Sequence, residues 1–287
     1  MNYKAVQSVI KTVIHDESNK GQIVFRLFLT FLFRLYKLLP FRRPFTIKLG
    51  SGAKYSIDPD VPNCCGVVYT RVYEYSAMEV VRNNVMERET MIDIGAHTGL
   101  YSLQLADIFS NFILFEPAIE TYEVLRKNFQ LNNALSQTLH NLAVGDMPGK
   151  GVVERTRLFD GMATIVPVDE EQKQTLVQIN TLDALCCETK AGFLKIDVEG
   201  FELKVLKGAV NFLKASPRIL IHIEITENFE EILVFFTKLN FKLFFLDANG
   251  SLSPVLTSEC ANKRNPVFYP QVSRGDFWAF GPEIKPR

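Results

Sequence analysis

Met91-Ile-Asp-Ile-Gly-Ala-His-Thr-Gly99 is the stretch of sequence that decides the fold of this chain. Its apolar residues predict a buried strand over 90–94, its glycines predict a turn, and the residues that follow predict a helix over 99–108. A second apolar strand over 112–116 ends in Glu116. A strand, a glycine turn, a helix and an acid closing the next strand are typical of a nucleotide-binding βαβ unit, in which the acid accepts hydrogen bonds from ribose hydroxyls.

The spacing of the glycines indicates which nucleotide this unit binds. A dinucleotide site requires G-x-G-x-x-G, because the backbone must approach a pyrophosphate closely. This turn has only Gly95 and Gly99, and Asp93 stands two residues before the first glycine. A carboxylate there would repel a pyrophosphate but suits the ammonium and sulfonium groups of S-adenosylmethionine. The pattern D-x-G-x-x-x-G, together with Glu116, therefore favours a methyl donor over a nicotinamide dinucleotide.

Length and charge limit the classes of protein that this chain can belong to. Its 287 residues suit one large domain with an N-terminal extension, and 47% hydrophobic residues suffice for a core. Lysine plus arginine and aspartate plus glutamate both total 32, so no nucleic-acid partner is expected. Five cysteines without C-x-x-C spacing predict reduced thiols, and the start of the chain lacks a signal-peptide pattern, so we expect a cytoplasmic protein.

Residues 1–44 are predicted to form a helical N-terminal extension. Asn2–His15 shows the spacing of an amphipathic helix, and Ile23–Leu39 is a strongly apolar segment. Seventeen residues with three aligned cations do not suit a membrane span. Two interpretations of 23–39 remain open: a helix packed on the domain or in a dimer seam, or a peripheral helix on a membrane surface, with the basic stripe at lipid phosphates and the apolar face in the acyl layer. On a helix the polar stripe comprises Arg26, Thr30, Arg34 and Lys37, and the lipid-facing residues include Phe25, Leu32 and Leu39.

The rest of the chain is predicted to form a hairpin and a helix over 45–89, and then an α/β domain over 90–287. Alternating strands and helices imply a Rossmann-like, mostly parallel seven-stranded sheet with helices on both faces. The last two strands would form an antiparallel pair at one edge. Ligands of such sheets bind at the carboxyl ends of the strands, where the strand order reverses. The expected strands are 90–94, 112–116, 137–142, 192–197, 218–225, 241–246 and 276–281, and the expected helices are 99–108, 119–131, 201–214 and 228–239.

A second motif, Phe193-Leu-Lys-Ile-Asp-Val-Glu-Gly200, ends another central strand. Asp197 is expected at the carboxyl end of that strand, where its side chain would enter the ligand crevice, and Glu199 is expected in the turn that follows. The alternative is that one of these acids caps the helix that starts at Phe201, as acids at helix starts commonly do.

The order of several motifs resembles the FkbM family of S-adenosylmethionine-dependent methyltransferases over roughly residues 70–250. This resemblance implies a class I methyltransferase fold and methylation of hydroxyl oxygens on sugars, glycans or similar small natural products. It further implies that Asp93, Gly95 and Gly99 form the turn around the methionine moiety, that Glu116 binds the ribose, that Asn141 and Ala143 lie on the adenine side, and that Asp197 and Glu199 face the acceptor as catalytic residues. The motifs are Tyr73-Glu74, 93–99, 115–117, 141–146, 180–183 and 195–200 leading into 202–208.

The chain departs from the family pattern at His97, where asparagine is usual; we expect His97 to stabilise the turn. A divalent metal is possible but not favoured: His222 and Glu224, on one strand face, could join Asp197 as ligands. Alternatively, Glu224 closes its strand and His222 is a hydrogen-bonded core histidine. Two other functions stay open, a catalytically silent binding domain and, less favoured, a nicotinamide oxidoreductase. The loops 58–75 and 251–274 are candidates to cover the acceptor.

Overall fold

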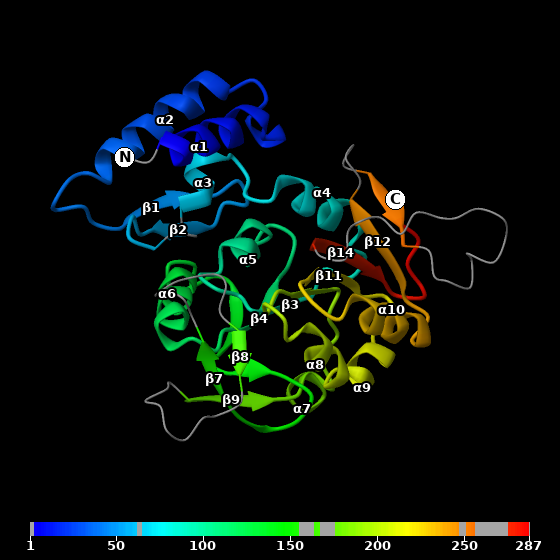
Figure 1. The fold of residues 1–287 in the computed structure, drawn as a ribbon. Coiled ribbons are helices and arrows are strands. Elements are labelled where there is room, and N and C mark those ends of the chain that lie inside the picture. Colours follow the sequence, from blue (N-terminus) through cyan, green and yellow to red (C-terminus); the bar gives the residue numbers. More distant parts are fainter. Residues whose placement is uncertain are drawn as a thin grey trace.

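The computed structural model describes residues 3–61, 65–154, 164–166, 176–246, 251–255 and 275–286. The chain begins with α1 (Tyr3–His15), a 3-10 turn (Glu17–Asn19) and α2 (Ile23–Tyr36). Figure 1 shows α1 and α2 lying against each other next to α3 (Gly66–Tyr69), away from the main sheet. None of the helices in the described ranges has the length and apolar character that crossing a bilayer requires.

The predicted hairpin is present as β1 (Phe45–Lys48) and β2 (Lys54–Ile57), paired antiparallel, and α4 (Tyr75–Asn84) leads into the domain. Two asparagines of α6 (Ile119–Gln130) and the turn after it hold the hairpin: Asn128 accepts a hydrogen bond from Ser56 N, and Asn132 accepts one from Lys54 N. Tyr55 is fully buried, and its hydroxyl lies 2.8 Å from Thr98 Oγ1 in the glycine turn. The hairpin therefore packs against the glycine turn that follows β3.

The main sheet confirms the predicted Rossmann-like fold. Its strand order is β13-β12-β14-β11-β10-β3-β4-β5. Parallel pairing joins β11, β10, β3, β4 and β5, whereas β14 is antiparallel to both β11 and β12, so the expected antiparallel edge is present. The strand bounds are β3 (Thr90–Ile94), β4 (Asn111–Phe115), β5 (Ser136–His140), β10 (Phe193–Ile196), β11 (Leu220–Ile225), β12 (Lys242–Leu246), β13 (Leu252–Pro254) and β14 (Gly275–Phe280).

The sheet has eight strands rather than the expected seven, because β13 pairs with the outer side of β12. This strand is only three residues long and ends in Pro254, which is tolerated at a sheet edge. A segment so short carries no alternating pattern, which explains why the sequence did not predict it. A separate small sheet of order β6-β9-β7-β8 occupies the irregular region after β5; its strands are β6 (Ala143–Val144), β7 (Gly149–Glu154), β8 (Thr164–Val166) and β9 (Leu176–Asn180).

Helices cover both faces of the main sheet, and alternate strand residues serve the two faces. Met91 packs with α4, α5 (Leu100–Gln104) and α6, whereas Ile92 packs on the opposite face. Phe33 of α2 and Tyr55 of β2 belong to the same buried cluster as Met91, so residues before 90 share that core. The helices on the opposite face are α7 (Leu182–Cys186), α8 (Glu202–Lys207), α9 (Val210–Lys214) and α10 (Phe229–Lys238).

Two predicted helices are shorter in the structure. Helix α5 ends at Gln104 rather than at 108, and the helix expected over 201–214 is divided into α8 and α9 around Gly208. A Cβ atom on Gly208 would lie 1.9 Å from the carbonyl oxygen of Gly145. The helix is interrupted where the chain passes this close to the loop after β6, a contact that local sequence spacing does not reveal.

Candidate active site

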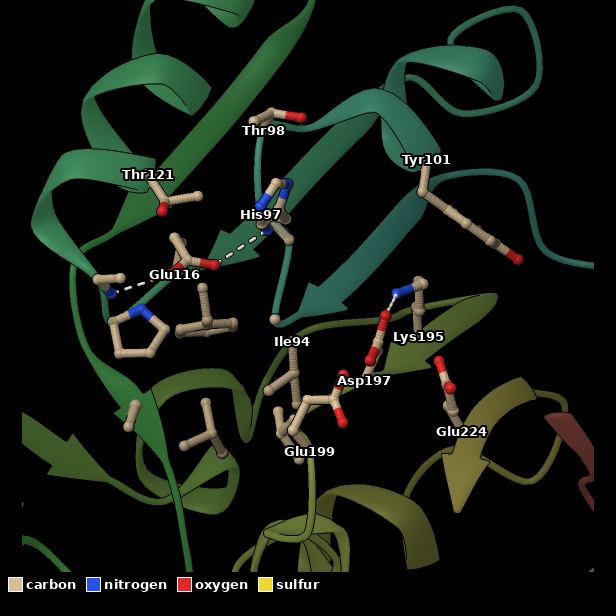
Figure 2. A pocket seen from close by; sticks show the side chains of 18 of the residues that line it. Ile94, His97, Thr98, Tyr101, Glu116, Thr121, Lys195, Asp197, Glu199 and Glu224 are labelled. Carbon is tan, nitrogen blue, oxygen red and sulfur yellow. Dashed lines mark hydrogen bonds and ion pairs between the residues drawn. The ribbon is translucent and has the colours of Figure 1, made fainter. Parts of the chain in front are cut away.

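A cavity of about 390 Å³ opens at the carboxyl ends of β3 and β10, where the strand order reverses. This is the position at which doubly wound sheets bind their ligands. In Figure 2, His97 and Glu116 lie on one side of the cavity, and Lys195, Asp197 and Glu224 lie on the other. The lining comes from the turn after β3, the end of β4, the region 142–144 and the segment after β10.

The glycine turn after β3 brings the two predicted motifs into contact. Gly95 has φ +84°, and a Cβ atom there would lie 1.8 Å from the carbonyl oxygen of Asp197. Only glycine permits this conformation and this approach. Gly95 lines the cavity. Gly99 does not; it has φ +81°, and a Cβ atom there would lie 2.6 Å from Leu125 Cδ1 in α6. Gly99 thus packs the turn against that helix.

His97 occupies the left-handed region, with φ +48°, and lines the cavity. Asparagine and histidine are both enriched at such positions, which explains how histidine can stand where the family usually has asparagine. The backbone N–H of His97 donates a hydrogen bond of 3.0 Å to Glu116 Oε2. The backbone of His97 therefore helps to hold the acid that the sequence assigns to the ribose.

Glu116 is 7% exposed and is held by two backbone donors, since Ala118 N also donates to its Oε1 at 2.9 Å. These bonds fix the carboxylate at the cavity wall. The side chain of Asn141 donates to the carbonyl oxygens of Glu116 and Pro117, both at 2.9 Å, and does not line the cavity. Ala143 does line it, so of the two residues predicted on the adenine side only Ala143 reaches the cavity directly.

Asp93 lies in the core rather than on the cavity wall. Its side chain is completely buried, Oδ2 accepts a hydrogen bond of 2.6 Å from Ser102, and Oδ1 has no hydrogen-bond partner among the described residues. Burial raises the pKa of Asp93, against the opposing effect of Lys195 directly across the strand pair. The expected contact between Asp93 and a ligand cation stays a prediction, because the carboxylate is not among the lining groups.

Lys195 and Asp197 form an ion pair at the carboxyl end of β10, with Nζ 2.6 Å from Oδ2. The ammonium also lies 5.1 Å from the centre of the Tyr101 ring. Burial alone would lower the pKa of Lys195, but the carboxylates of Asp197, Asp93 and Glu74 outweigh it and raise the pKa. Lys195 is therefore protonated at neutral pH. Glu199 lines the cavity with φ +50°, so both predicted acceptor-side acids reach it.

Two further carboxylates line the cavity, those of Glu74 and Glu224. Burial, followed by repulsion from Asp197 and Asp276, raises the pKa of Glu224 to about 8. Glu74 and Tyr73 come from the end of the loop 58–75 that was expected to cover the acceptor. Most of the other candidate loop, 251–274, lies outside the described residues.

His222 is committed to the core. Its Nδ1 lies 2.9 Å from the Tyr101 hydroxyl, its Nε2 lies 3.0 Å from Asp276 Oδ1, and its ring stacks on Trp278 at 4.1 Å. Both ring nitrogens thus have protein partners, as in the core-histidine interpretation. Within the described ranges, no group of three or more histidine, cysteine, aspartate or glutamate side chains is arranged to hold a metal ion.

The cavity is acidic. Five carboxyl groups line it, of which Glu224, with a pKa of about 8, is mostly protonated at neutral pH; Lys195 is the only lysine or arginine among the described lining residues, and it is already paired with Asp197. A ligand with net positive charge fits this set of groups, and a pyrophosphate does not. The carboxyl groups are those of Glu74, Glu116, Asp197, Glu199 and Glu224.

The sequence motifs contain Lys195 and Glu74 but give neither a role, and Glu224 is predicted only as a metal ligand or as the residue that closes its strand. A signal for Lys195 existed, because a lysine within Phe193-Leu-Lys-Ile196 interrupts a strand that is buried on both faces. No comparable signal existed for Glu74, which reaches the cavity through its left-handed φ of +52° just before α4.

The sequence profile of the family described as Methyltransferase FkbM domain matches residues 93–243, more than half of the chain. Methyltransferase sdnD from Sordaria araneosa is 27% identical over 177 residues, which cover 49% of this chain and 67% of that protein. Methyltransferase 1 from Beauveria bassiana is 24% identical over 142 residues, which cover 41% of this chain and 57% of that protein. The solved structure of methyltransferase FkbM from Methylobacillus flagellatus aligns with a TM-score of 0.45 at 16% identity, over 92% of this chain and 61% of that one.

Proposed function

The chain belongs to the FkbM methyltransferase family, and from this premise we propose that it transfers the methyl group of S-adenosylmethionine to a hydroxyl oxygen of a sugar, a glycan or a similar small natural product. The observation that carries this proposal is an acidic cavity at the sheet's switch point, with Glu116 fixed by two backbone N–H groups. The carboxylate of Glu116 is proposed to accept hydrogen bonds from the ribose hydroxyls.

The charge of the cavity supports this cofactor over a dinucleotide. When bound, S-adenosylmethionine supplies an electrophilic methyl carbon on a positively charged sulfur. Glu116 and Ala143 are proposed to hold its nucleoside, and the turn at Gly95 its methionine moiety. The buried carboxyl of Asp93 lies beneath that turn, and its Oδ1 has no hydrogen-bond partner among the described residues. A nicotinamide dinucleotide would instead bring a pyrophosphate toward these carboxylates.

The acids on the other side of the cavity provide the groups that a hydroxyl acceptor needs. Methyl transfer is an in-line displacement, so the protein must align the hydroxyl oxygen with the methyl carbon and accept the hydroxyl proton. Asp197, oriented by Lys195, is proposed to position the hydroxyl through a hydrogen bond. Glu224, which lines the cavity and whose pKa is raised to about 8, is proposed to take the proton as the new C–O bond forms and the C–S bond breaks. Glu199 remains a second candidate for either contact.

Calorimetry with S-adenosylmethionine and with NAD tests the cofactor. We expect the first ligand to bind and the second not to bind. Glu116→Gln should weaken binding by roughly tenfold or more, because a charge-assisted hydrogen bond contributes about 1.5–3 kcal/mol. The matched control is Glu188→Gln, an exposed acid outside the cavity. Binding of NAD instead would favour an oxidoreductase, and wild-type affinity in Glu116→Gln would exclude the assigned ribose contact.

Mass spectrometry with trideuteromethyl-labelled cofactor tests the reaction. Extract from cells lacking the protein should contain the unmethylated acceptor, and addition of the protein should produce a compound carrying the labelled methyl group. Fragmentation should place the label on oxygen. A protein that binds the cofactor and labels no compound in such extracts would support the catalytically silent alternative.

A further inference from the structure

Helix α2 presents its polar stripe to the protein and its apolar side chains to the outside. Thr30 and Phe33 are 4% and 5% exposed, and α2 packs on α1 and α3. Arg26 and Arg34 belong to the same stripe and are partly buried. This corrects the expectation that the polar stripe faces lipid phosphates. Helix α2 packs on the fold, as in the packing interpretation. The side that it buries carries the polar stripe, whereas an amphipathic helix normally buries its apolar side.

The apolar face of α2 consists of Val24, Phe25, Phe28, Phe31, Leu32 and Leu35, whose exposed fractions lie between 43% and 83%. Leu38 and Phe41 continue this face beyond the helix and are 71% and 89% exposed. Single exposed apolar residues are ordinary, but a contiguous face with three phenylalanines marks a surface that contacts another body.

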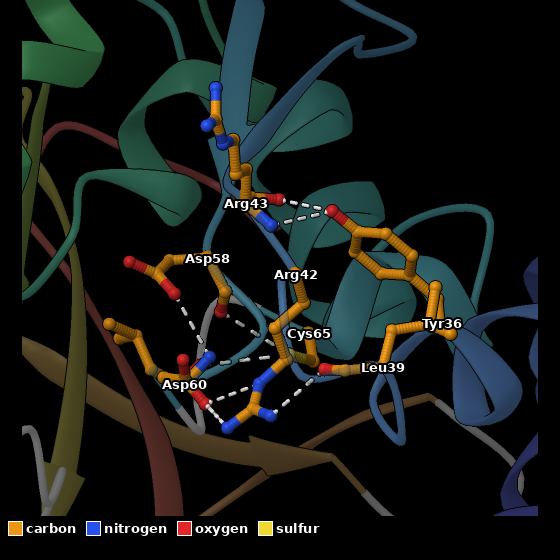
Figure 3. A network of polar contacts seen from close by, with 8 residues as sticks. Tyr36, Leu39, Arg42, Arg43, Asp58, Asp60 and Cys65 are labelled. Carbon is orange, nitrogen blue, oxygen red and sulfur yellow. Dashed lines mark hydrogen bonds and ion pairs between the residues drawn. The ribbon is translucent and has the colours of Figure 1, made fainter.

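Polar contacts fix the segment that extends the apolar face (Figure 3). The Tyr36 hydroxyl donates to the carbonyl oxygen of Arg43 at 2.6 Å and accepts from Arg43 N at 2.7 Å. The guanidinium of Arg42 pairs with Asp60 at 2.6 Å. Leu38 and Phe41 are therefore held on a defined loop next to the helix.

The charges near the apolar face of α2 indicate which kind of partner binds it. Between Gly21 and Gly50 the chain has no aspartate or glutamate and six cations, of which Arg26, Arg34 and Lys37 belong to the stripe that packs toward the protein and Arg42 is paired with Asp60. Arg43 and Lys48 are exposed at the end of this stretch. A second copy of the chain, packed about a twofold axis, would bring two sets of cations together, which is unfavourable. An anionic bilayer offers both an acyl layer for the phenylalanines and phosphates for the cations.

We propose that the apolar face of α2 docks in the plane of an anionic lipid bilayer. A helix of 14 residues is about 21 Å long, too short to span a membrane but suited to lie at its surface. The docking element is firmly joined to the cavity: Asn19 Oδ1 and Ser18 Oγ, between α1 and α2, accept hydrogen bonds from Arg71 N and Val72 N at 3.0 and 3.1 Å. Tyr73 and Glu74, which line the cavity, follow directly. Docking therefore sets the position of the cavity above the bilayer.

Flotation of the full chain with vesicles tests this proposal, and it is independent of the methyltransferase assignment. Wild type should float with vesicles that contain phosphatidylserine and not with phosphatidylcholine alone, and added salt should reduce flotation because it screens the cations. The variant Phe25→Ser/Phe28→Ser/Phe31→Ser should stay in the soluble fraction, as should Arg43→Gln/Lys48→Gln. The matched control Met147→Ser/Leu176→Ser/Val234→Ser removes exposed apolar side chains elsewhere and should float like wild type.

Sedimentation of the same proteins without vesicles tests the alternative that the apolar face binds a second copy of the chain. A wild-type dimer that the triple phenylalanine variant converts to a monomer, with no flotation of wild type, would overturn the proposal and assign the face to self-association. Equal flotation of wild type and both variants would also overturn it. Circular dichroism of each variant confirms that it is folded before the comparison is made.

Discussion

The ammonium of Lys195 lies 2.6 Å from Oδ2 of Asp197, and across the strand pair Lys195 also faces the buried Asp93. The buried ammonium of Lys195 thus lies next to one acid from each motif: Asp93, beneath the glycine turn, and Asp197, at the cavity. The side chain of Lys195 is 7% exposed. If its charge is removed, water therefore cannot easily reach and solvate the acids that it contacts.

Lys195→Met should destabilise the protein by about 3 kcal/mol, because it leaves Asp93 buried without a nearby cation. Urea denaturation measures the change in the free energy of unfolding. Lys190→Met, an exposed lysine, is the control. Adding Asp93→Asn to Lys195→Met should recover part of the loss, since it removes the uncompensated charge. An additive or larger loss in the double variant would contradict the pairing of Lys195 with Asp93.

Asp197→Asn should retain the fold and most of the cofactor affinity and lower turnover on the order of 100-fold, because the acceptor hydroxyl loses the charged partner proposed to position it. Once the acceptor is identified, formation of methylated product over time measures this. Glu188→Gln should behave as wild type. Turnover within a few-fold of wild type in Asp197→Asn would remove Asp197 from the reaction.

Glu224 should make stability depend on pH. Its pKa rises from the ordinary value of 4.5 to about 8 in the folded protein. Between these values the folded state keeps a proton that the unfolded chain releases, so the free energy of unfolding falls as pH rises from about 5 to 8. Glu224→Gln should remove this part of the decline, which denaturation at several pH values detects.

Ionisation of Glu224 should make turnover rise with pH, whereas it makes the free energy of unfolding fall. As the proposed proton acceptor, Glu224 must be ionised, so the rate should rise as pH increases through about 8. Glu224→Gln should be slow and should lack this rise. A wild-type rate that is flat between pH 7 and about 9 would exclude the role of Glu224 as base.

Gly95→Ala should be strongly destabilising and should abolish cofactor binding. The new Cβ would overlap the carbonyl oxygen of Asp197 at 1.8 Å, and φ of +84° would itself cost about 1–3 kcal/mol. Gly50→Ala is the matched control, because a Cβ there meets no atom within 4 Å. Thermal denaturation with and without S-adenosylmethionine compares the two. A stable Gly95→Ala variant that still binds would refute the close approach of the two motifs.

His97→Asn should leave stability and cofactor affinity unchanged within about 0.5 kcal/mol, because asparagine also accepts the left-handed conformation. His97→Val should cost about 1–3 kcal/mol, because a β-branched residue does not adopt it readily. Denaturation and calorimetry on the two variants test whether the residue matters through its backbone. A loss of turnover in His97→Asn at normal affinity would give the imidazole a chemical role.

The sequence predicted the fold in detail where the pattern is long and periodic. Each of the seven expected strands is present within two residues at either end. The central strands β3 and β10 are buried on both faces and therefore form near-continuous apolar runs. The sequence did not predict the interruption at Gly208 or the edge strand β13. The interruption depends on a contact with Gly145, which is distant in the chain, and β13 is too short to carry an alternating pattern.

The sequence by itself determined the βαβ unit and the two motifs at the strand ends, because these follow from spacing and residue type. Only the tertiary structure decided that Asp93 and Asn141 lie behind the cavity while Glu74 and Glu224 enter it. It also decided that α2 buries its polar stripe and exposes its phenylalanines. Periodicity defines the two sides of a helix, but which side meets the protein depends on the surfaces that the rest of the fold presents to it.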